Sequence, residues 1–443
     1  MKYIETFKST VLVLLIFLSA TLTFSIWTYS PKFETNVQPP PVDISVVDAN
    51  KKELKGITEI VKPYKLLFNF EEGLKGTTDS NEIEQSIDAI TGWTISNIVL
   101  TDSEFTEKEL DTLLRKKNRF TLFYPGEVPL SVYDVVLNNK DSNIPEISFD
   151  RLIVDWNPAS KAMEIHFVSR TNGTRYTGKI TDYKSFNRTV LTSGRSYSDY
   201  IEVGPENPPY IAVPKNPVEI VSNTYIQGEI NPSRFRDALF TDPNAVRRGQ
   251  VSSSRELFQD VHAIMRVETL LKTLSFFHPV AESEDLAIPS DLLLDTIGFV
   301  NEHGGWTDDF RYTSMSPQSR KVKFQLYVQG LPVYSDTAST EIEQTWGDDR
   351  IYKYIRPYYT LTSTLPSEMK VVTLPPGTEV AEIIAQSEDV NLSTVEEIDL
   401  GYFMKYDTER RLFILEPSWF YLIKGKWIRY SPENLGGDMI GLE

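Results

Sequence analysis

The stretch FMKYDTERRLFILEP, from Phe403 to Pro417, repeats a pattern found earlier in the chain as IMRVETLLKTLSFFHP, from Ile264 to Pro279. Each stretch has a methionine, a basic residue, an apolar residue, an acid and a threonine in that order. Each then passes through a basic turn into an apolar run that stops at a proline. This order is typical of an antiparallel hairpin, so we expect two similar hairpins about 139 residues apart.

A helix over Glu256–Leu274 is the alternative for the first stretch. Leu270, Leu271 and Leu274 also fit a period of 3.6 residues, which is the period of an amphipathic helix. The recurrence of the whole pattern favours strands.

The element before each hairpin is also shared. A short helix with a proline at its start is expected before each of them, at Pro232 and at Pro376. A fainter version of the same order, a helix and then a strand pair, begins at Val128. The recurrence predicts that residues 210–310 and 311–430 are related by duplication.

Helix boundaries are marked by local signals. Thr106 and Glu109 have the spacing of a capping box, and the basic run that starts at Arg115 suits the last turn of the same helix. A later helix is predicted with Ser290 as its N-cap and with Gly304 as its end.

The composition excludes several classes of function. The chain of 443 residues has 45 basic and 62 acidic residues and a net charge of −17, so it is repelled by nucleic acids. It has no cysteine, which rules out disulfides, thiolate metal sites and cysteine nucleophiles. We therefore expect no nucleic-acid partner.

An uncharged segment from Ser9 to Pro31 is long enough to cross a lipid bilayer as a helix. A cleaved signal peptide is the alternative, but the small-residue site around Ala20 is poor and the apolar run continues beyond it. Lys2 and Lys8 lie in the short stretch before this segment, and their positive charge favours a cytoplasmic N-terminus. We expect a single-pass protein of the cell membrane, held in the bilayer by this helix, with its bulk outside.

The predicted fold class is α+β, with an N-terminal transmembrane helix followed by three mixed domains with antiparallel sheets. Proline-rich segments separate the parts. In chain order, we expect a cytoplasmic N-terminus (residues 1–8), a transmembrane helix (9–30), a proline-rich spacer (31–43), an N-terminal extracytoplasmic domain (44–204), a middle domain (210–310), a C-terminal domain (311–430) and a tail (431–443).

The chain lacks a recognisable catalytic motif. Its four histidines do not show metal-ligand spacing, and no nucleophile elbow, phosphate loop or dinucleotide motif occurs. Adjacent acids such as Asp308-Asp309 and Glu396-Glu397 are interpreted as solvated charge rather than as a glycosidase pair. We expect no enzyme activity and no catalytic, cofactor-binding or metal-binding residue.

Aromatic residues gather in two stretches, around Arg356-Pro357 and from Trp419 to Trp427. They suit either core packing or a surface that contacts another protein, because tyrosine, tryptophan and arginine supply much of the energy at such contacts.

Several motifs in this sequence resemble the YycH family of low-GC Gram-positive bacteria. The resemblance covers nearly the whole chain and is loosest over residues 42–204. Relatives have a short glycine-containing turn where this chain has the longer segment 247–261. The motifs are FRDALFTDP (Phe235–Pro243), FVNEHGGW (Phe299–Trp306), YVQGLPVYS (Tyr327–Ser335), YIRPYYTL (Tyr354–Leu361) and FILEPSWFY (Phe413–Tyr421).

The resemblance implies a non-enzymatic accessory protein. Members of the family act with a sister protein, YycI, on the membrane histidine kinase WalK, also called YycG, of a two-component system that controls the cell wall. The partners implied are therefore a WalK-like kinase and a YycI-like protein. A surface-anchored protein that binds or processes the cell wall is the alternative.

One face of the predicted anchor suits contact with another helix. Small or hydroxyl side chains at a spacing of four residues let helix backbones approach in a bilayer. The residues of this candidate transmembrane partner face are Leu12, Ile16, Ser19, Ala20 and Thr23. Back-bonding of the hydroxyl groups to their own helix is the alternative.

Overall fold

Both repeated stretches fold as antiparallel hairpins, which confirms the strand prediction. In the computed structural model of the chain, β13 (Ile264–Glu268) pairs with β14 (Thr273–Phe277), and β22 (Glu397–Asp407) pairs with β23 (Leu412–Ile423). The helical alternative for Glu256–Leu274 is therefore wrong.

The two hairpins share their register and their turn. Met265 and Met404, 139 positions apart, are both fully buried, and each lies opposite an apolar residue of the following strand. The turns end at Lys272 and Arg411, whose φ angles are 53° and 56°. Equivalent left-handed residues close the two turns in the same way. The relation of residues 210–310 to 311–430 by duplication stays a prediction.

The structure describes most of the chain after residue 53. Described are Leu15, Ser19 and Val46, and then residues 54–431 except for 138–143, 157–162, 184–185, 205–208 and 388–389. The chain divides into two compact units, residues 1–44 and 45–443. Leu15 and Ser19 are helical and exposed. No helix within the described residues is long and apolar enough to span a bilayer, and the rest of the predicted anchor lies outside them.

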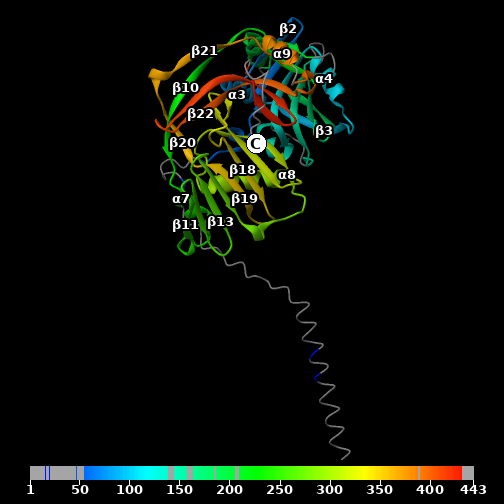
Figure 1. Ribbon diagram of the computed structural model, residues 1–443. Coiled ribbons are helices and arrows are strands. Elements are labelled where there is room, and N and C mark those ends of the chain that lie inside the picture. Colours follow the sequence, from blue (N-terminus) through cyan, green and yellow to red (C-terminus); the bar gives the residue numbers. More distant parts are fainter. Residues whose placement is uncertain are drawn as a thin grey trace, which may run out of the picture. The chain divides into compact units, whose positions relative to one another are not determined.

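A nine-stranded antiparallel sheet organises the first part of the described chain, which we call the first lobe (residues 54–214). Its order is β3-β7-β6-β5-β4-β1-β2-β8-β9. Its strands are β1 (Lys65–Phe70), β2 (Gly73–Thr77), β3 (Thr94–Asp102), β4 (Arg119–Pro129), β5 (Ser148–Asp155), β6 (Met163–Ser169), β7 (Thr174–Asp182), β8 (Ser198–Val203) and β9 (Ile211–Pro214). In Figure 1 β3 and α4 lie at the right of the molecule, away from β10 and β21.

A second sheet runs through the remaining described residues, 215–431, which we call the second lobe. Its order is β11-β12-β13-β14-β19-β18-β16-β17-β22-β23-β10-β20, with β15, β21 and β24 paired at its sides. Its other strands are β10 (Val218–Glu229), β11 (Arg247–Ser252), β12 (Arg255–Gln259), β15 (Phe310–Ser316), β16 (Lys321–Val328), β17 (Leu331–Tyr334), β18 (Glu341–Trp346), β19 (Ile351–Pro357), β20 (Tyr359–Thr364), β21 (Lys370–Leu374) and β24 (Lys426–Arg429).

The prediction of purely antiparallel sheets is wrong for this second sheet, which is mixed. β17 and β22 run parallel, with Val333 opposite Tyr402. A parallel pair needs a long crossover connection, which the chain between these strands supplies. The fold class α+β is confirmed for the described residues.

Helices cover the sheets at several points. They are α2 (Ile57–Ile60), α3 (Ser80–Thr91), α4 (Glu107–Arg115), α5 (Leu130–Leu137), α6 (Thr192–Ser196), α7 (Pro232–Leu239), α8 (Pro289–Glu302) and α9 (Gly377–Gln386). Single turns are η2 (Asn187–Leu191), η3 (Pro243–Ala245), η4 (Pro279–Ala281), η5 (Pro366–Glu368) and η6 (Leu392–Thr394). The predicted helices before both hairpins are present as α7 and α9.

The caps of α4 and α8 follow local chemistry. The capping box of α4 is formed, because the Thr106 hydroxyl accepts from the Glu109 amide and the Glu109 carboxylate accepts from the Thr106 amide. The predicted N-cap of α8 is wrong: Ser290 lies inside the helix, since Pro289 takes the first helical position. The helix ends as predicted, with Gly304 in the left-handed region at a φ of 61°.

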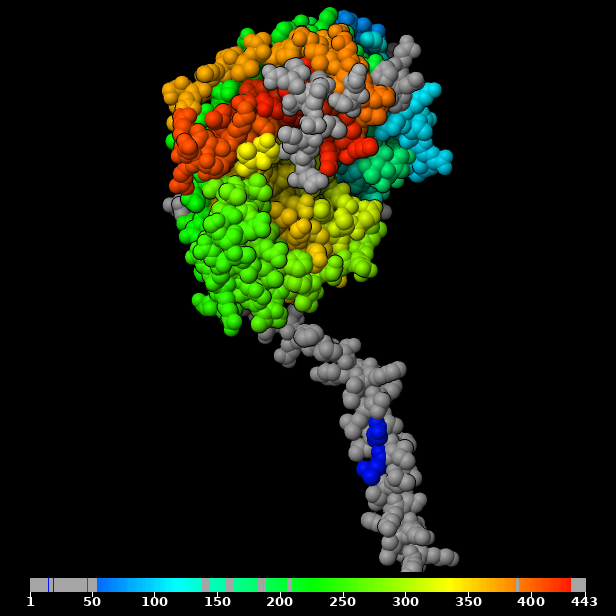
Figure 2. Space-filling model, in the orientation of Figure 1, coloured from blue at the N-terminus to red at the C-terminus, as the bar shows by residue number. Residues whose placement is uncertain are grey.

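The long segment that interrupts the family pattern is a hairpin. β11 and β12 pair across a short turn, and every residue of β11 is exposed. The hairpin extends the edge of the second sheet beyond β13 and belongs to the green surface at the lower left of Figure 2.

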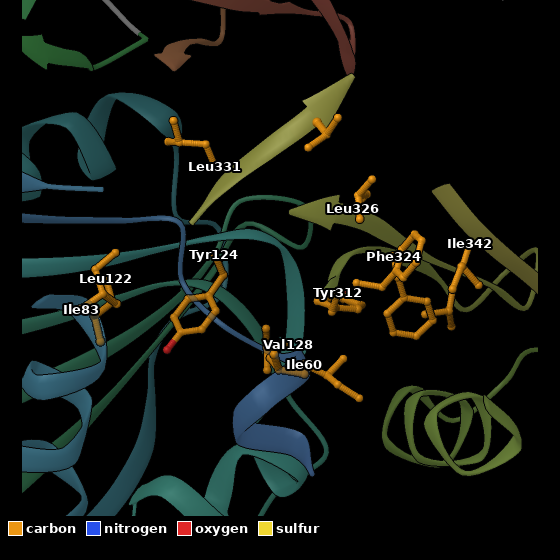
Figure 3. Packing of buried hydrophobic residues seen from close by; sticks show 14 of the residues in the cluster. Ile60, Ile83, Leu122, Tyr124, Val128, Tyr312, Phe324, Leu326, Leu331 and Ile342 are labelled. Carbon is orange, nitrogen blue, oxygen red and sulfur yellow. The ribbon is translucent and has the colours of Figure 1, made fainter. Parts of the chain in front are cut away.

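Apolar packing joins the two lobes. Tyr124 and Val128 on β4 belong to the same buried cluster as Tyr312 and Phe324, as Figure 3 shows. The Tyr312 hydroxyl donates to the carbonyl oxygen of Glu127. A Cβ at Gly126 would lie 2.4 Å from the Thr313 carbonyl oxygen, so the two backbones approach closely only because residue 126 is glycine.

Candidate binding cavity between the lobes

A cavity of about 360 Å³ lies where the first lobe meets the second lobe. Side chains on β4, β5 and the loop before β1 line it from the first lobe, and side chains on β17, β22, β23 and β24 line it from the second. We call it the interlobe cavity. A volume of this size suits a small ligand.

Lys65 holds two carboxylates of the second lobe beside this cavity. Its Nζ lies 2.7 Å from Glu397 Oε1 and 3.5 Å from Asp399 Oδ2. The Tyr64 hydroxyl donates to the other Glu397 oxygen at 2.9 Å. Lys65 is 1% exposed and Asp399 is 8% exposed, so these charges are removed from water and depend on one another.

Burial alone would lower the pKa of Lys65, but the carboxylates of Glu397 and Asp399 outweigh it and hold the pKa above its ordinary value. Burial raises the pKa of Asp399 to about 6, and the negative charge of Glu397 adds to the rise while Lys65 opposes it. Asp399 Oδ2 is buried and accepts no hydrogen bond from the described residues.

Asp150 holds two arginines that line the same cavity, Arg151 and Arg170. Arg170 Nε donates to Asp150 Oδ2 at 2.5 Å, and Arg151 Nη1 donates to the same oxygen at 3.2 Å. Arg151 Nη1 also donates to the Tyr124 carbonyl oxygen. The Nη atoms of Arg170 and the Nε and Nη2 atoms of Arg151 have no hydrogen-bond partner among the described residues.

Tyr64 interacts with both the acidic and the basic groups of the cavity. The pKa of its hydroxyl is raised well above the ordinary value, first by burial and then by the charge of Glu397, while Arg151 and Arg170 act in the opposite direction.

Glu127 lies near Asp150, the carboxylate that holds the two arginines. Its Oε1 accepts from the Ser169 hydroxyl at 2.9 Å and from the Thr171 amide at 3.3 Å, while Oε2 is buried without a partner among the described residues. Burial raises the pKa of Glu127 to about 7, and the neighbouring Asp150 carboxylate adds to the rise.

Aromatic side chains form the apolar wall. The Tyr334 ring centroid lies 4.6 Å from that of Phe420 and 6.1 Å from that of Trp427. The three rings come from β17, β23 and β24. All three line the cavity.

A second and more open cavity of about 780 Å³ lies beside residues 306–309 and 360–362. Asp308 lines it, and its Oδ1 accepts from the Leu361 amide at 3.1 Å while Oδ2 is buried without a hydrogen-bond partner in the described part of the chain. Burial raises the pKa of Asp308 to about 7.

The predicted transmembrane partner face stays a prediction, because most of its residues lie outside the part of the chain that the structure describes. Ser19 is helical and exposed, while Leu12, Ile16, Ala20 and Thr23 lie outside the described residues. The aromatic stretches are mainly core: Tyr354, Tyr358 and Tyr359 are buried, as are Trp419, Phe420 and Tyr421.

The acid pairs were misread in part. Glu397 and Asp308 were expected to be solvated, but Glu397 is buried, Asp308 is half-buried with its Oδ2 atom fully buried, and both side chains line cavities. Sequence reasoning missed Lys65, Arg151 and Arg170 altogether. A lysine or arginine inside an apolar strand was the available signal, since such a residue is rarely buried without a partner. Among the described residues, no group of three histidine, aspartate or glutamate side chains could hold a metal ion.

Fold and cavity together define a two-lobed α+β protein whose lobes enclose a small charged site. Family models for the YycH protein match nearly the whole length, the N-terminal domain over residues 5–187 and the C-terminal domain over residues 210–434. The chain belongs to the YycH family.

A curated protein and a solved structure from Bacillus subtilis, both named YycH, agree with this assignment. The two-component system WalR/WalK regulatory protein YycH of strain 168 is 20% identical over 445 residues, which cover 97% of each chain. The crystal structure of YycH from this species matches with a TM-score of 0.71 at 16% identity, and the match covers 85% of this chain and 98% of the other. The likeness to the solved structure shows the shared fold.

Proposed function

We propose that this chain is an accessory regulator of a WalK-like membrane histidine kinase, in a two-component system that controls cell-wall metabolism. The observation that carries the proposal is the match over 97% of both chains to a regulatory protein of the WalR/WalK system. Both family models also match, so the chain has both halves of such a regulator.

The proposal places the chain in the cell membrane as a single-pass protein. The uncharged segment 9–30 is long enough to cross a bilayer, and the lysines before it favour a cytoplasmic N-terminus. Both lobes then lie outside the cell, where a YycI-like sister protein is the second partner. In this arrangement the contact with the kinase includes the face with Ser19 and Thr23.

A pair of matched variants tests the membrane contact. Ser19→Leu with Thr23→Leu adds bulk to the proposed face while it preserves an apolar helix. Thr21→Leu with Ser25→Leu makes the same chemical change about 200° away on an ideal helix. We expect the first pair to lower the crosslinking yield with the kinase and the control pair to leave it unchanged, with equal membrane fractionation of both.

The opposite result has a clear meaning. Equal kinase crosslinking by both pairs would show that this face is not the contact. If the chain fails to co-purify with any histidine kinase but binds purified peptidoglycan or teichoic acid, the regulatory proposal is wrong and the wall-binding alternative is favoured.

A further inference from the structure

The interlobe cavity contains hydrogen-bond donors that the protein itself does not use. Asp150 fixes Arg151 and Arg170 through one edge of each guanidinium group. Their remaining nitrogens have no partner among the described residues, and both side chains line the cavity. A fixed guanidinium with free nitrogens is suited to bind a carboxylate through two hydrogen bonds.

The same cavity contains one carboxylate oxygen that lacks a donor. Glu397 is engaged by Lys65 and Tyr64, whereas Asp399 Oδ2 accepts no hydrogen bond from the described residues. Lys65 Nζ lies 3.5 Å from this oxygen, which gives charge compensation without a hydrogen bond. A buried acceptor left in this state is costly, so a ligand that supplies a donor here gains free energy.

The other acidic groups of the cavity already have partners. Glu341 accepts from Lys323 Nζ at 3.1 Å, and Glu396 accepts from the Gly425 amide at 3.3 Å. Two sets of hydrogen-bonding groups therefore remain without a protein partner: the guanidinium nitrogens of Arg151 and Arg170, which can bind an anion, and the Asp399 Oδ2 atom, which can accept from a donor.

The size and the apolar wall limit the ligand further. Tyr334, Phe420 and Trp427 offer ring surfaces to an apolar or aromatic group. A volume of about 360 Å³ is near the lower end for ligand pockets, which excludes a folded partner and suits a molecule of one or two residues.

We propose that the interlobe cavity binds a free amino acid or dipeptide by its two charged ends. The carboxylate lies on Arg151 and Arg170, the ammonium group donates to Asp399, and the side chain packs against Tyr334, Phe420 and Trp427. Since the anion site belongs to the first lobe and Asp399 to the second, the bound molecule bridges the lobes. This site does not depend on the proposed role beside a kinase.

Capped peptides test whether the two charged ends of the ligand are needed for binding. The full chain is titrated by calorimetry with the dipeptides Ala-Phe, Ala-Leu, Ala-Lys and Ala-Ala. The best binder is then compared with its C-terminal amide and its N-acetyl form. We expect each cap to weaken binding by about tenfold or more, because each removes one charged end of the ligand and at least one charge-assisted hydrogen bond.

Two variants of the protein test the roles of Arg170 and Asp399 in binding. Arg170→Gln should weaken binding of the free dipeptide but not of its amide, and Asp399→Asn should weaken binding of the free dipeptide but not of its N-acetyl form. Arg195→Gln is the matched control, because Arg195 is an exposed arginine of the first lobe that does not line the cavity. Its affinities should equal those of the unchanged chain.

Three results would overturn the proposal. They are no binding of any of the four dipeptides, equal affinity for free and capped forms, and a loss in Arg170→Gln that is the same for the free dipeptide and its amide. Arg170→Gln keeps the test decisive if Asp399→Asn does not fold, since Arg170 is outside the ion-paired group around Lys65.

Discussion

Lys65 Nζ lies 2.7 Å from Glu397 Oε1, although 332 residues separate the two in the sequence. Lys65 is at the start of β1 in the first lobe, and Glu397 is at the start of β22 in the second. Their side chains are 1% and 6% exposed. This buried ion pair ties the two lobes together at the edge of the cavity.

Lys65→Met should destabilise the chain by about 3–5 kcal/mol, because it leaves the buried charges of Glu397 and Asp399 without their cation. The measurement is the midpoint of unfolding in urea at pH 7. Lys75→Met is the control, since Lys75 pairs with a half-exposed Asp199 at the surface and should shift the midpoint far less. Equal shifts in the two variants would refute a structural role for the interlobe pair.

Gly126→Ala should lower stability by about 1–3 kcal/mol, because the new Cβ would lie 2.4 Å from the Thr313 carbonyl oxygen and force the lobes apart. Gly249→Ala is the matched control: residue 249 is also in a strand, and nothing lies within 4 Å of a Cβ there. Thermal unfolding of both variants is the measurement. A control that melts as early as Gly126→Ala would show that the contact with Thr313 is not the cause.

The raised pKa of Glu127 predicts a pH dependence of stability. The folded chain holds this proton up to a pH of about 7, whereas the unfolded chain releases it near 4.5, so the folded state binds more protons between these values. The stabilisation is complete at the acidic end and is lost as the pH rises to 7. Glu127→Gln imitates the protonated form at every pH. The melting temperature of the variant minus that of the unchanged chain should therefore be larger at pH 8 than at pH 5.

Exposed Glu164 on β6 offers a control for this experiment. Glu164→Gln should follow the melting curve of the unchanged chain at both pH values. If Glu127→Gln also runs parallel to the unchanged chain, then the burial of Glu127 beside Asp150 does not govern its protonation.

The two equivalent methionines should respond alike. Met265→Ala and Met404→Ala each remove a fully buried side chain and should each cost about 2–5 kcal/mol. Met369 is 40% exposed, so Met369→Ala should cost much less. Chemical denaturation of the three variants is the measurement, and a small effect at either buried position would mean that its hairpin is not part of the core.

Local structure in this chain follows from residues close together in sequence. The capping box at Thr106 and Glu109, the stop at Gly304 and the turn residues Lys272 and Arg411 act within a few positions, so short patterns predicted them. The N-cap of α8 was predicted at Ser290, two positions after the observed N-cap Ile288, because a proline at the first helical position overrode the hydroxyl signal. The two hairpins could be predicted for the same reason, since each strand pairs with its neighbour across a short turn.

Only the tertiary structure decided how these elements meet and what they enclose. The first hairpin lies beside β19 and the second beside β10, and no local pattern distinguishes these partners. Glu396-Glu397 has the sequence pattern of solvated charge, but the tertiary structure places Glu397 beside Lys65, which compensates its charge. Pairing across hundreds of residues is chosen by the burial and charge compensation of the whole chain, whereas caps and turns are set by the few residues that form them.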